Sequence, residues 1–487
     1  MLVSLYTVRV KLGILGIEDY GIYEVAGGIV VLFTFLNGAM TSATQRFLNF
    51  AIGQNDTEQA RNVFSISFII YILIAVLVVI LAETAGLWFF YNWLNIPPER
   101  QAAAFVVYQF SVVATIMGIL QIPYRAIIIA YEKMSFFALL SIFEAAFKLG
   151  IVFLLSIILF DKLKVYALLV SIVALIIFLI YKIYCNRMFT ISHFRYCKEK
   201  DLFRQLAAFS GWSVFGQFAG VCGRKGINIL INIFHGVTMN AAMGIAMQVN
   251  AAVYTFVSNF QTAFKPQIIK SYAAEDNDYF MRLIFRSSKV SYYLLFFFVL
   301  PLYINADFVL MIWLKNVPEY SVIFTQLMLL HSLEIAVSGP LVMAIQATGK
   351  IKKYQLIASC LIFANLPLSF LFLHLGFSPA WVLIIKIALN AVTFLWRIFY
   401  LREMVNLPVI AFLHDVIIPI IIITGISSLV IYYISSFFID WAKLLLSCVI
   451  STLCIGTLVY IFGINKQEKI LIKNRIKISS YNINEKI

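Results

Sequence analysis

The feature that most constrains this chain is a succession of apolar runs, each long enough to cross a lipid bilayer. One run reads FSISFIIYILIAVLVVILAETAGLWFF and contains a single acidic residue. An α-helix needs about 20 such residues to span the hydrocarbon core. Because 62% of the 487 residues are hydrophobic and only 12% are charged, lipid must be the solvent for much of this chain. The sequence predicts an all-α integral membrane protein.

Fourteen helices account for the apolar runs. The first is incomplete, because we expect the opening run 1–12 to be too short to span a bilayer, and no cleavable signal peptide is visible. Helices 2 to 14 are predicted, in chain order, at about 21–45, 63–91, 102–130, 135–160, 164–185, 209–234, 240–264, 284–312, 320–347, 354–375, 379–400, 410–437 and 441–463.

The net charge of +14 follows the helices rather than one patch. Loops on one side of the predicted membrane carry 26 of the 37 Lys and Arg residues, loops on the other side carry 7, and four lie inside helices. This bias is typical of the positive-inside rule and assigns the first side, with the C-terminus, to the cytoplasm. It argues against a nucleic-acid partner and predicts a multi-pass protein of the bacterial cytoplasmic (inner) membrane.

The helices divide into two lobes of six. We predict five parts: an N-lobe at 1–185, a basic amphipathic cytoplasmic linker that lies on the membrane surface at 186–208, a C-lobe at 209–403, two further helices at 404–465 and a basic cytoplasmic tail at 466–487. An even number of helices per lobe keeps both lobes in the same orientation. The predicted symmetry is therefore a pseudo-two-fold axis along the membrane normal.

Two sequence echoes support this repeat. IPYRAIIIAYEK and GPLVMAIQATGK end helices 4 and 10 and share three residue types at one offset of 217. ATQRFLNFAIGQND after helix 2 and AFKPQIIKSYAAED after helix 8 each join a basic helix end to a short acidic segment.

Several of these stretches resemble the multidrug/oligosaccharidyl-lipid/polysaccharide (MOP) flippase superfamily, in its polysaccharide (O-antigen-type) transporter branch. The resemblance covers most of residues 1–400 and rests on LGIEDYGIYEVAGGIVVLFTFLNGAMTSATQRFL, IPYRAIIIAYEKM, FSGWSVFGQFAG and NAAMGIAMQVNAAVYTFVSNFQTAFKPQIIKSYA. It implies a transporter that moves undecaprenyl-diphosphate-linked oligosaccharide from the cytoplasmic to the outer leaflet for surface polysaccharide, including lipopolysaccharide, biosynthesis. The incomplete helix 1 departs from the superfamily, in which that helix lines the cavity and carries a cation, here Arg9.

Ionisable residues inside the membrane are costly and mark pathways or structural pairs. Helix 7 carries Arg224 and Lys225 near its middle, flanked by Gly223 and Gly226, which we expect to let backbone or ligand approach closely. Adjacent cations repel one another, so an anion such as a diphosphate is their natural partner. The alternative is that Lys225 pairs with a carboxylate on another helix while Arg224 extends towards the interface. Lys386, alone on helix 12, adds to the cationic set.

Two other pairs stand at helical spacing. Glu144 and Lys148 on helix 5 are spaced for an intrahelical ion pair, with substrate contact by Lys148 as the alternative. His331 and Glu334 share one face of helix 10, where they either couple transport to a cation or proton or act as structural partners of Lys225 or Lys386.

The predicted function is lipid-linked oligosaccharide flipping, and the alternative is Na⁺- or H⁺-coupled multidrug export by the same fold. Cations outnumber carboxylates within the helices, which favours an anionic cargo. An enzyme is not expected, because no outer loop holds a catalytic cluster and no nucleotide-binding motif is present. Six scattered cysteines indicate neither a metal site nor a disulfide framework, and we expect no cofactor. Expected partners are membrane lipids, the lipid-linked oligosaccharide diphosphate and polysaccharide polymerase or assembly proteins, around a monomer.

Overall fold

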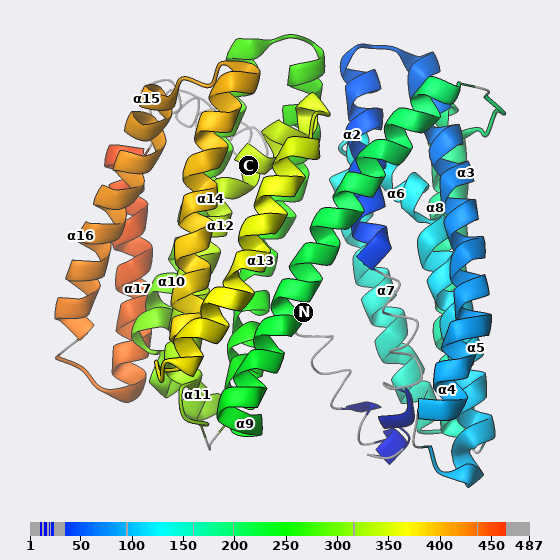
Figure 1. The fold of residues 1–487 in the computed structure, drawn as a ribbon, viewed down its shortest axis with the longest axis horizontal. Coiled ribbons are helices and arrows are strands. Elements are labelled where there is room, and N and C mark those ends of the chain that lie inside the picture. The colour runs from blue at the N-terminus through cyan, green and yellow to red at the C-terminus, as the bar shows by residue number, and fades with distance from the viewer. Residues whose placement is uncertain are drawn as a thin grey trace, which may run out of the picture. The chain divides into compact units, whose positions relative to one another are not determined.

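The computed structural model describes residues 10–11, 14–16, 19, 21–23, 35–93, 96–158, 160–197, 199–314, 317–435 and 437–463. Every regular element among these residues is a helix, and none of them forms a strand (Figure 1). Eleven helical segments within the described ranges are long and apolar enough to cross a membrane. The predicted all-α membrane architecture is confirmed.

The eleven segments coincide with predicted helices 3 to 6 and 8 to 14. Predicted helix 1 lies mostly outside the described residues. Helix 2 corresponds to α2 (Phe35–Gly53), and helix 7 is the first part of α9 (Lys200–Ala273). Helix 7 is less apolar than the others because it carries Arg224 and Lys225 near its middle.

The chain forms two compact units. Unit 1 comprises Met1–Ala219, Ile269–Asp276 and Gly349–Leu356. Besides α2 and the ends of α9, its elements are α3 (Thr57–Leu81), η2 (Ala82–Gly86), α4 (Leu87–Trp93), η3 (Pro98–Arg100), α5 (Gln101–Leu120), α6 (Ile122–Ala130), α7 (Met134–Leu155), α8 (Lys162–Met188) and η4 (Thr190–Ser192).

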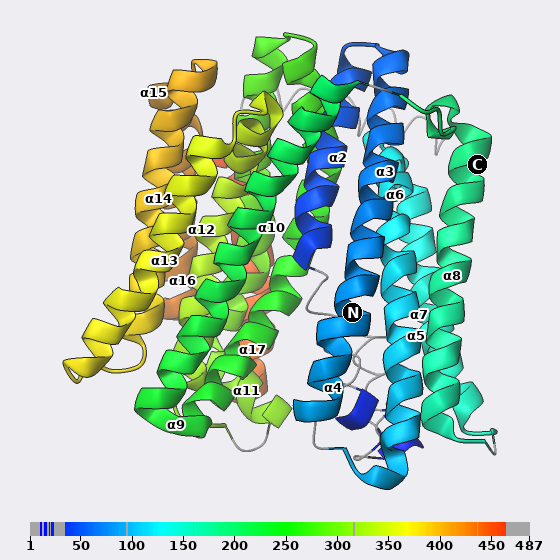
Figure 2. The same cartoon turned by 45° about the vertical axis from the view of Figure 1, so that its right-hand side comes forward.

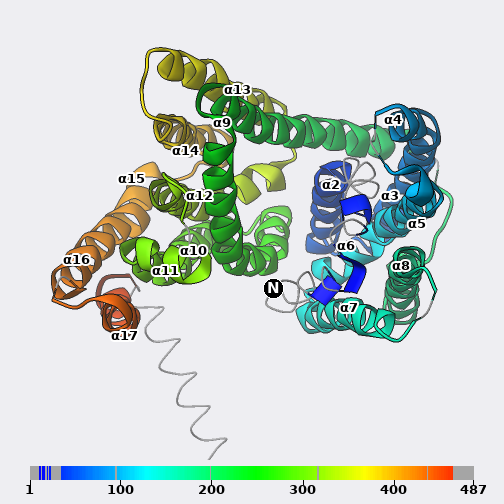
Figure 3. The same cartoon turned by 90° about the horizontal axis from the view of Figure 1, so that it is seen from below.

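Within unit 1, α5 and α8 share the most extensive helix contact, and α7 lies along α8 (Figures 2 and 3). Small side chains on α5, among them Ala104 and Val107, are fully buried and allow close approach. The Tyr108 hydroxyl donates to the carbonyl of Ala82 at 2.7 Å, so its polar group is satisfied inside the apolar core.

One arginine connects three separate segments of unit 1. Arg100, at the end of η3, donates from Nε to Asp19 Oδ1 at 2.9 Å and from Nη1 to Asp161 Oδ2 at 3.2 Å. Asp161 also caps α8 by accepting from the Leu163 amide at 3.1 Å. A guanidinium can bind two carboxylates because its five donors point in fixed directions.

Unit 2 comprises Gly220–Ile268, Asn277–Thr348 and Ile357–Ile487. Its elements, besides the middle of α9, are α10 (Asn277–Ile304), α11 (Ala306–Leu314), α12 (Ser321–Thr348), α13 (Lys352–His374), α14 (Trp381–Val405), α15 (Val409–Phe412), η5 (Leu413–Ile417), α16 (Ile418–Ser435), α17 (Asp440–Leu458) and η6 (Val459–Gly463).

The centre of unit 2 is α12, which packs against α10 and α14, while α16 and α17 lie side by side next to α10 (Figure 1). Gln261 of α9 connects three helices: its amide donates to Ser291 Oγ at 3.2 Å and to the Ala336 carbonyl at 3.0 Å. Gly339 makes this possible, since a Cβ there would lie 2.6 Å from the Gln261 side chain.

The long α9 contains the junction between predicted helices 7 and 8. Gly236 interrupts it with φ 78° and ψ −171°, inside the predicted loop between 234 and 240. Helix α9 starts at Lys200, within the amphipathic segment that we assigned to the linker 186–208. Leu206 and Phe209 are buried there, and Phe209 contacts the Phe47 ring at 5.9 Å. Part of the apolar face of this segment therefore packs on α2.

The internal repeat is visible in the backbone. Glu132 and Gly349, which stand 217 residues apart, both have positive φ, at 58° and 78°. Asn55 and Glu275, which correspond in the second sequence echo, have φ of 57° and 59°. Left-handed residues of this kind commonly end helices. The repeat therefore extends to the backbone: α6 and α12 end with a left-handed residue at corresponding positions, and so do α2 and α9.

These four helix ends meet inside unit 1. Lys270 of α9 forms an ion pair with Glu132 at 2.8 Å, and Gly53 of α2 lies against the Lys270 backbone. Gly349 lies against Arg46, whose guanidinium carbon is 4.5 Å from the centre of the Phe47 ring. The segments Ile269–Asp276 and Gly349–Leu356 group with unit 1 for this reason.

We predict that Gly349→Ala lowers the melting temperature of the purified protein more than Gly376→Ala does. Both glycines have left-handed φ, which costs alanine about 1–2 kcal/mol. At Gly376 no atom lies within 4 Å of an added Cβ, whereas at Gly349 the Arg46 Nη2 atom would be 2.6 Å away. Displacing the buried Arg46 adds about 1–3 kcal/mol. Equal thermal shifts in detergent would contradict the close Arg46 contact.

Candidate functional site

The candidate site in unit 2 is a set of basic side chains on three helices: the cations Arg224, Lys225 and Lys386, with the imidazole of His331 beside them. Arg224 and Lys225 are exposed on α9, Lys386 is half-buried on α14, and His331 is buried on α12. Lys386 is close enough to both Arg224 and His331 to influence them electrostatically. The structure therefore brings three of the sequence-predicted residues, from α9, α12 and α14, into one electrostatic group, which we call the cationic cluster.

No acidic partner neutralises the cluster among the described residues. Neither Arg224, Lys225 nor Lys386 forms a salt bridge within 4.0 Å there. The Lys386 ammonium instead lies 4.0 Å from the Met328 sulfur. Like charges raise one another's energy in a medium of low dielectric constant. An anionic ligand would therefore stabilise this arrangement.

The glycines beside Arg224 have a packing role. A Cβ on Gly223 would lie 2.8 Å from Ile362, and one on Gly226 would lie 2.7 Å from Leu366. Both neighbours belong to α13. The close approach predicted at these glycines is therefore made by a neighbouring helix, while Arg224 and Lys225 lie on the exposed side of α9.

Glu334 lies next to residues other than the predicted Lys225 and Lys386. Its carboxylate faces Asn390 and is attracted by Arg397, both on α14. The carboxylate oxygens are inaccessible to solvent, and neither is within hydrogen-bond distance of a donor. The cation that acts on Glu334 is therefore Arg397, which was not singled out from the sequence.

A signal for this arrangement is present in the sequence. Lys386, Asn390, Thr393 and Arg397 recur at intervals of three or four residues along α14. Residues at this spacing share one face of a helix. The polar stripe runs from the cationic cluster to Glu334, and it could have indicated Arg397 as the partner of that carboxylate.

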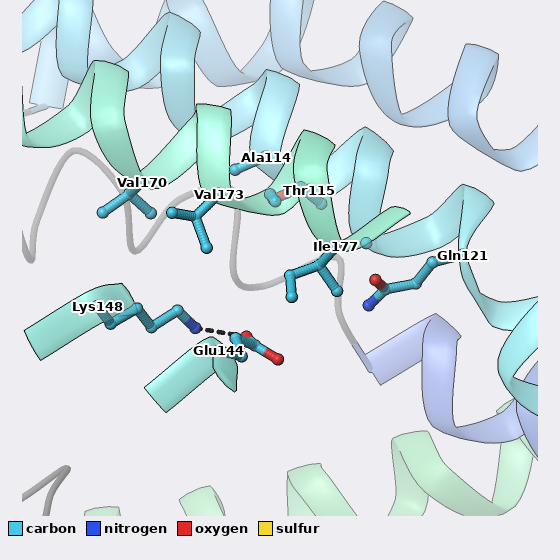
Figure 4. A pocket seen from close by; sticks show the side chains of 10 residues that line it. Ala114, Thr115, Gln121, Glu144, Lys148, Val170, Val173 and Ile177 are labelled. Atoms are coloured by element: carbon cyan, nitrogen blue, oxygen red, sulfur yellow. Dashed lines mark hydrogen bonds and ion pairs between the residues drawn. The ribbon is translucent and has the colours of Figure 1, made fainter. Parts of the chain in front are cut away.

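The second candidate region lies in unit 1. Lys148 donates from Nζ to Glu144 Oε1 at 2.7 Å, so the predicted intrahelical ion pair is confirmed. The pair borders a cavity of about 260 Å³ between α5, α7 and α8 (Figure 4). Because Glu144 balances its charge, Lys148 does not contribute an unpaired cation.

Two further predictions remain: a cavity cation at Arg9, and the expectation that the chain holds no metal site. Arg9 lies outside the described residues. Within the described ranges, no three His, Cys, Asp or Glu side chains are grouped as a metal site would require.

No protein-family model and no curated protein matches the sequence, but solved structures match the fold. An outward-facing multidrug resistance MATE family transporter of the MOP superfamily gives a TM-score of 0.70 at 13% identity, covering 83% of this chain and 92% of that chain. The MATE transporter ClbM, in complex with Rb⁺, gives 0.70 at 16% identity, covering 84% and 93%. A MOP superfamily transporter from Pyrococcus furiosus, for which a reverse polarity of the binding pocket is described, gives 0.65 at 13% identity, covering 85% and 94%.

The chain therefore has the fold of MATE transporters of the MOP superfamily. This confirms the fold that the resemblance implied. The polysaccharide branch within that superfamily stays a prediction, because these structures are described as MATE or MOP transporters.

We predict that Arg397→Met lowers the melting temperature, since it leaves the Glu334 carboxylate without its cation. Both side chains are only partly buried and no salt bridge joins them, so the cost should stay below the roughly 3–5 kcal/mol of a fully buried pair. The same substitution made in a Glu334→Gln background should cost less, with a coupling of about 0.5–3 kcal/mol. Arg402→Met, on the exposed surface of the same helix, is the matched control and should change little. Strictly additive effects in thermal unfolding would contradict the pairing.

Proposed function

We propose that this chain is a membrane transporter that flips an undecaprenyl-diphosphate-linked oligosaccharide from the cytoplasmic to the outer leaflet. The observation that carries the proposal is the cationic cluster of Arg224, Lys386 and His331, together with the neighbouring Lys225. A diphosphate supplies the negative charge that the described surroundings of the cluster lack. Arg224 can bind its oxygens with two parallel hydrogen bonds, while the lysines act as point charges.

The charge inventory of the spanning helices supports an anionic cargo. Of the two carboxylates predicted within the helices, Glu144 forms an ion pair with Lys148, and Glu334 is buried at its oxygens and attracted by Arg397. An exporter of cationic drugs needs a carboxylate available to its substrate. The cations of the cluster, in contrast, remain available to a ligand.

The membrane potential can supply energy for transport of this cargo, because the cargo is negatively charged. A polyprenyl tail can stay in the lipid while the charged head passes along the cluster. Outward movement of each negative charge is favoured by about 2.3 kcal/mol per 100 mV of inside-negative potential. We place the protein in the bacterial inner membrane as a monomer, with a cytoplasmic C-terminus and with polysaccharide polymerase or assembly proteins as partners.

A second candidate is Na⁺- or H⁺-coupled multidrug export, and the comparisons favour it over flipping. The solved structures with this fold include a multidrug resistance transporter and ClbM with bound Rb⁺. The same fold also occurs in the Pyrococcus furiosus transporter with reverse polarity of the binding pocket, for which a different function is suggested. Pocket charge therefore differs among proteins that share this fold, and it is the property that separates the two candidates here.

The experiment is complementation of a bacterium that lacks its oligosaccharide flippase, scored by surface polysaccharide. We expect the wild-type chain to restore polysaccharide and Arg224→Ala, Lys225→Ala and Lys386→Met to lose at least about tenfold, as expected when one charged contact worth about 1.5–3 kcal/mol is removed. Lys182→Ala, an exposed lysine on α8, is the matched control. All variants are compared at equal membrane levels.

Two results would contradict the proposal. Full restoration by all three cluster variants would remove the cluster as the diphosphate site. Failure of wild type to restore polysaccharide, combined with new resistance to cationic drugs in the same strain, would support multidrug export instead.

A further inference from the structure

The cavity in unit 1 has two chemically different walls. Lys148 and Glu144 of α7 make one side polar, and Val170, Val173 and Ile177 of α8 face them with apolar side chains. Thr115 of α5, beside Val173, and Gln121, at one end, add further polar groups to the lining. Figure 4 shows the ion pair facing the α8 side chains, with the Gln121 amide at one end.

The polar side chains that line the cavity retain unused hydrogen-bonding capacity. Among the described residues, the Thr115 and Gln121 side chains make no hydrogen bond, although both residues are half-buried in membrane-spanning helices. The ion pair uses one of three ammonium donors and one carboxylate oxygen. Polar groups without partners are costly away from water, so this lining favours a ligand rich in hydrogen-bonding groups.

The charge of the cavity excludes ions as preferred ligands. The side chains of Lys148 and Glu144 are 46% and 42% exposed, so a ligand can reach both. Because they neutralise each other at 2.7 Å, a cation would compete with Lys148 for the carboxylate, and an anion would compete with Glu144 for the ammonium. A neutral ligand that donates and accepts hydrogen bonds can contact both groups without separating them.

The size and shape of the cavity limit the class of ligand further. The cavity volume of about 260 Å³ is below the roughly 300–1,000 Å³ of pockets for drug-sized ligands. It suits one ring with hydroxyl groups on one side and C–H groups on the other. A pyranose sugar has this character, since its hydroxyls can bind the polar wall while its C–H face packs on Val173 and Ile177.

We propose that this cavity binds a single neutral sugar ring of the transported glycan, separately from the diphosphate site in unit 2. The inference rests on the proposed function only for the identity of the cargo. It assigns Thr115 and Gln121 as positioning residues for sugar hydroxyls. Gly118 leaves the space open, because no atom lies within 4 Å of a Cβ built there.

The test is binding of neutral monosaccharides to the purified full chain. Binding is measured as the rise in melting temperature that the ligand causes. The probes are glucose, galactose, mannose and N-acetylglucosamine, titrated to high millimolar concentration. We expect at least one to stabilise the wild type. Gly118→Leu fills the cavity without displacing protein atoms and should abolish this stabilisation while leaving the ligand-free melting temperature unchanged or higher.

The matched control is Gly150→Leu on α7. Its added Cβ also meets no atom within 4 Å, but Gly150 does not line the cavity, so sugar binding should persist. Thr115→Val and Gln121→Leu leave the size of the cavity nearly unchanged. Each should weaken sugar binding about tenfold, as expected for one lost hydrogen bond. Ser141→Ala on α7, whose hydroxyl bonds the Phe137 carbonyl, should change nothing.

Each outcome bears on the cavity itself. No sugar response in the wild type, or an unchanged response in Gly118→Leu, would overturn the inference. Pyrophosphate binding to the same samples reports the diphosphate site independently. Sugar binding that is lost in Gly118→Leu while pyrophosphate does not bind the wild type would retain the sugar site and remove the proposed flipping function.

Discussion

The interior of a bilayer supplies no water to the polar groups of a spanning helix, and this constraint determines which charges of the chain are available to a ligand. Glu144 is paired with Lys148 one turn away, and Glu334 lies next to Asn390 and in the electrostatic field of Arg397. Once both carboxylates are engaged, the cations of the cluster in unit 2 have no acidic partner in the described part of the chain. The selectivity that we infer is a consequence of this distribution.

Close helix packing arranges the same charges in space. Gly223 and Gly226 bring α13 against α9, which leaves Arg224 and Lys225 on the other, exposed side. Gln261 provides a comparable contact between α9, α10 and α12, because Gly339 leaves room for its amide. Small residues thus set the spacing of the helices, and the spacing determines which polar side chains meet.

Much of the fold was predictable because the bilayer imposes a strong length and polarity pattern on each helix. Eleven spanning segments fall where the apolar runs indicated, and the break at Gly236 falls in a predicted loop. The packing of the start of α9 was not predictable, since the sequence of an amphipathic segment does not indicate which neighbouring helix its apolar side chains contact, here Phe209 with Phe47 of α2.

The site was predictable in part for a related reason. Charged residues within apolar runs are conspicuous, so Arg224, Lys225, Lys386 and the pair on α7 were found directly. Their partners depend on rotation and packing of the helices, which a single run does not encode. Arg397 stands near a helix end and therefore resembled an ordinary loop cation, although its spacing from Lys386 and Asn390 placed all three on one face.

The central claim is that the chain selects an anionic head group. It is tested most directly by equilibrium binding of a soluble prenyl diphosphate and of a lipophilic cation such as tetraphenylphosphonium to the purified protein in nanodiscs. The account predicts that the prenyl diphosphate binds, that inorganic pyrophosphate and added salt weaken its binding, and that the cation does not compete. Saturable binding of the cation with no binding of the diphosphate would contradict it.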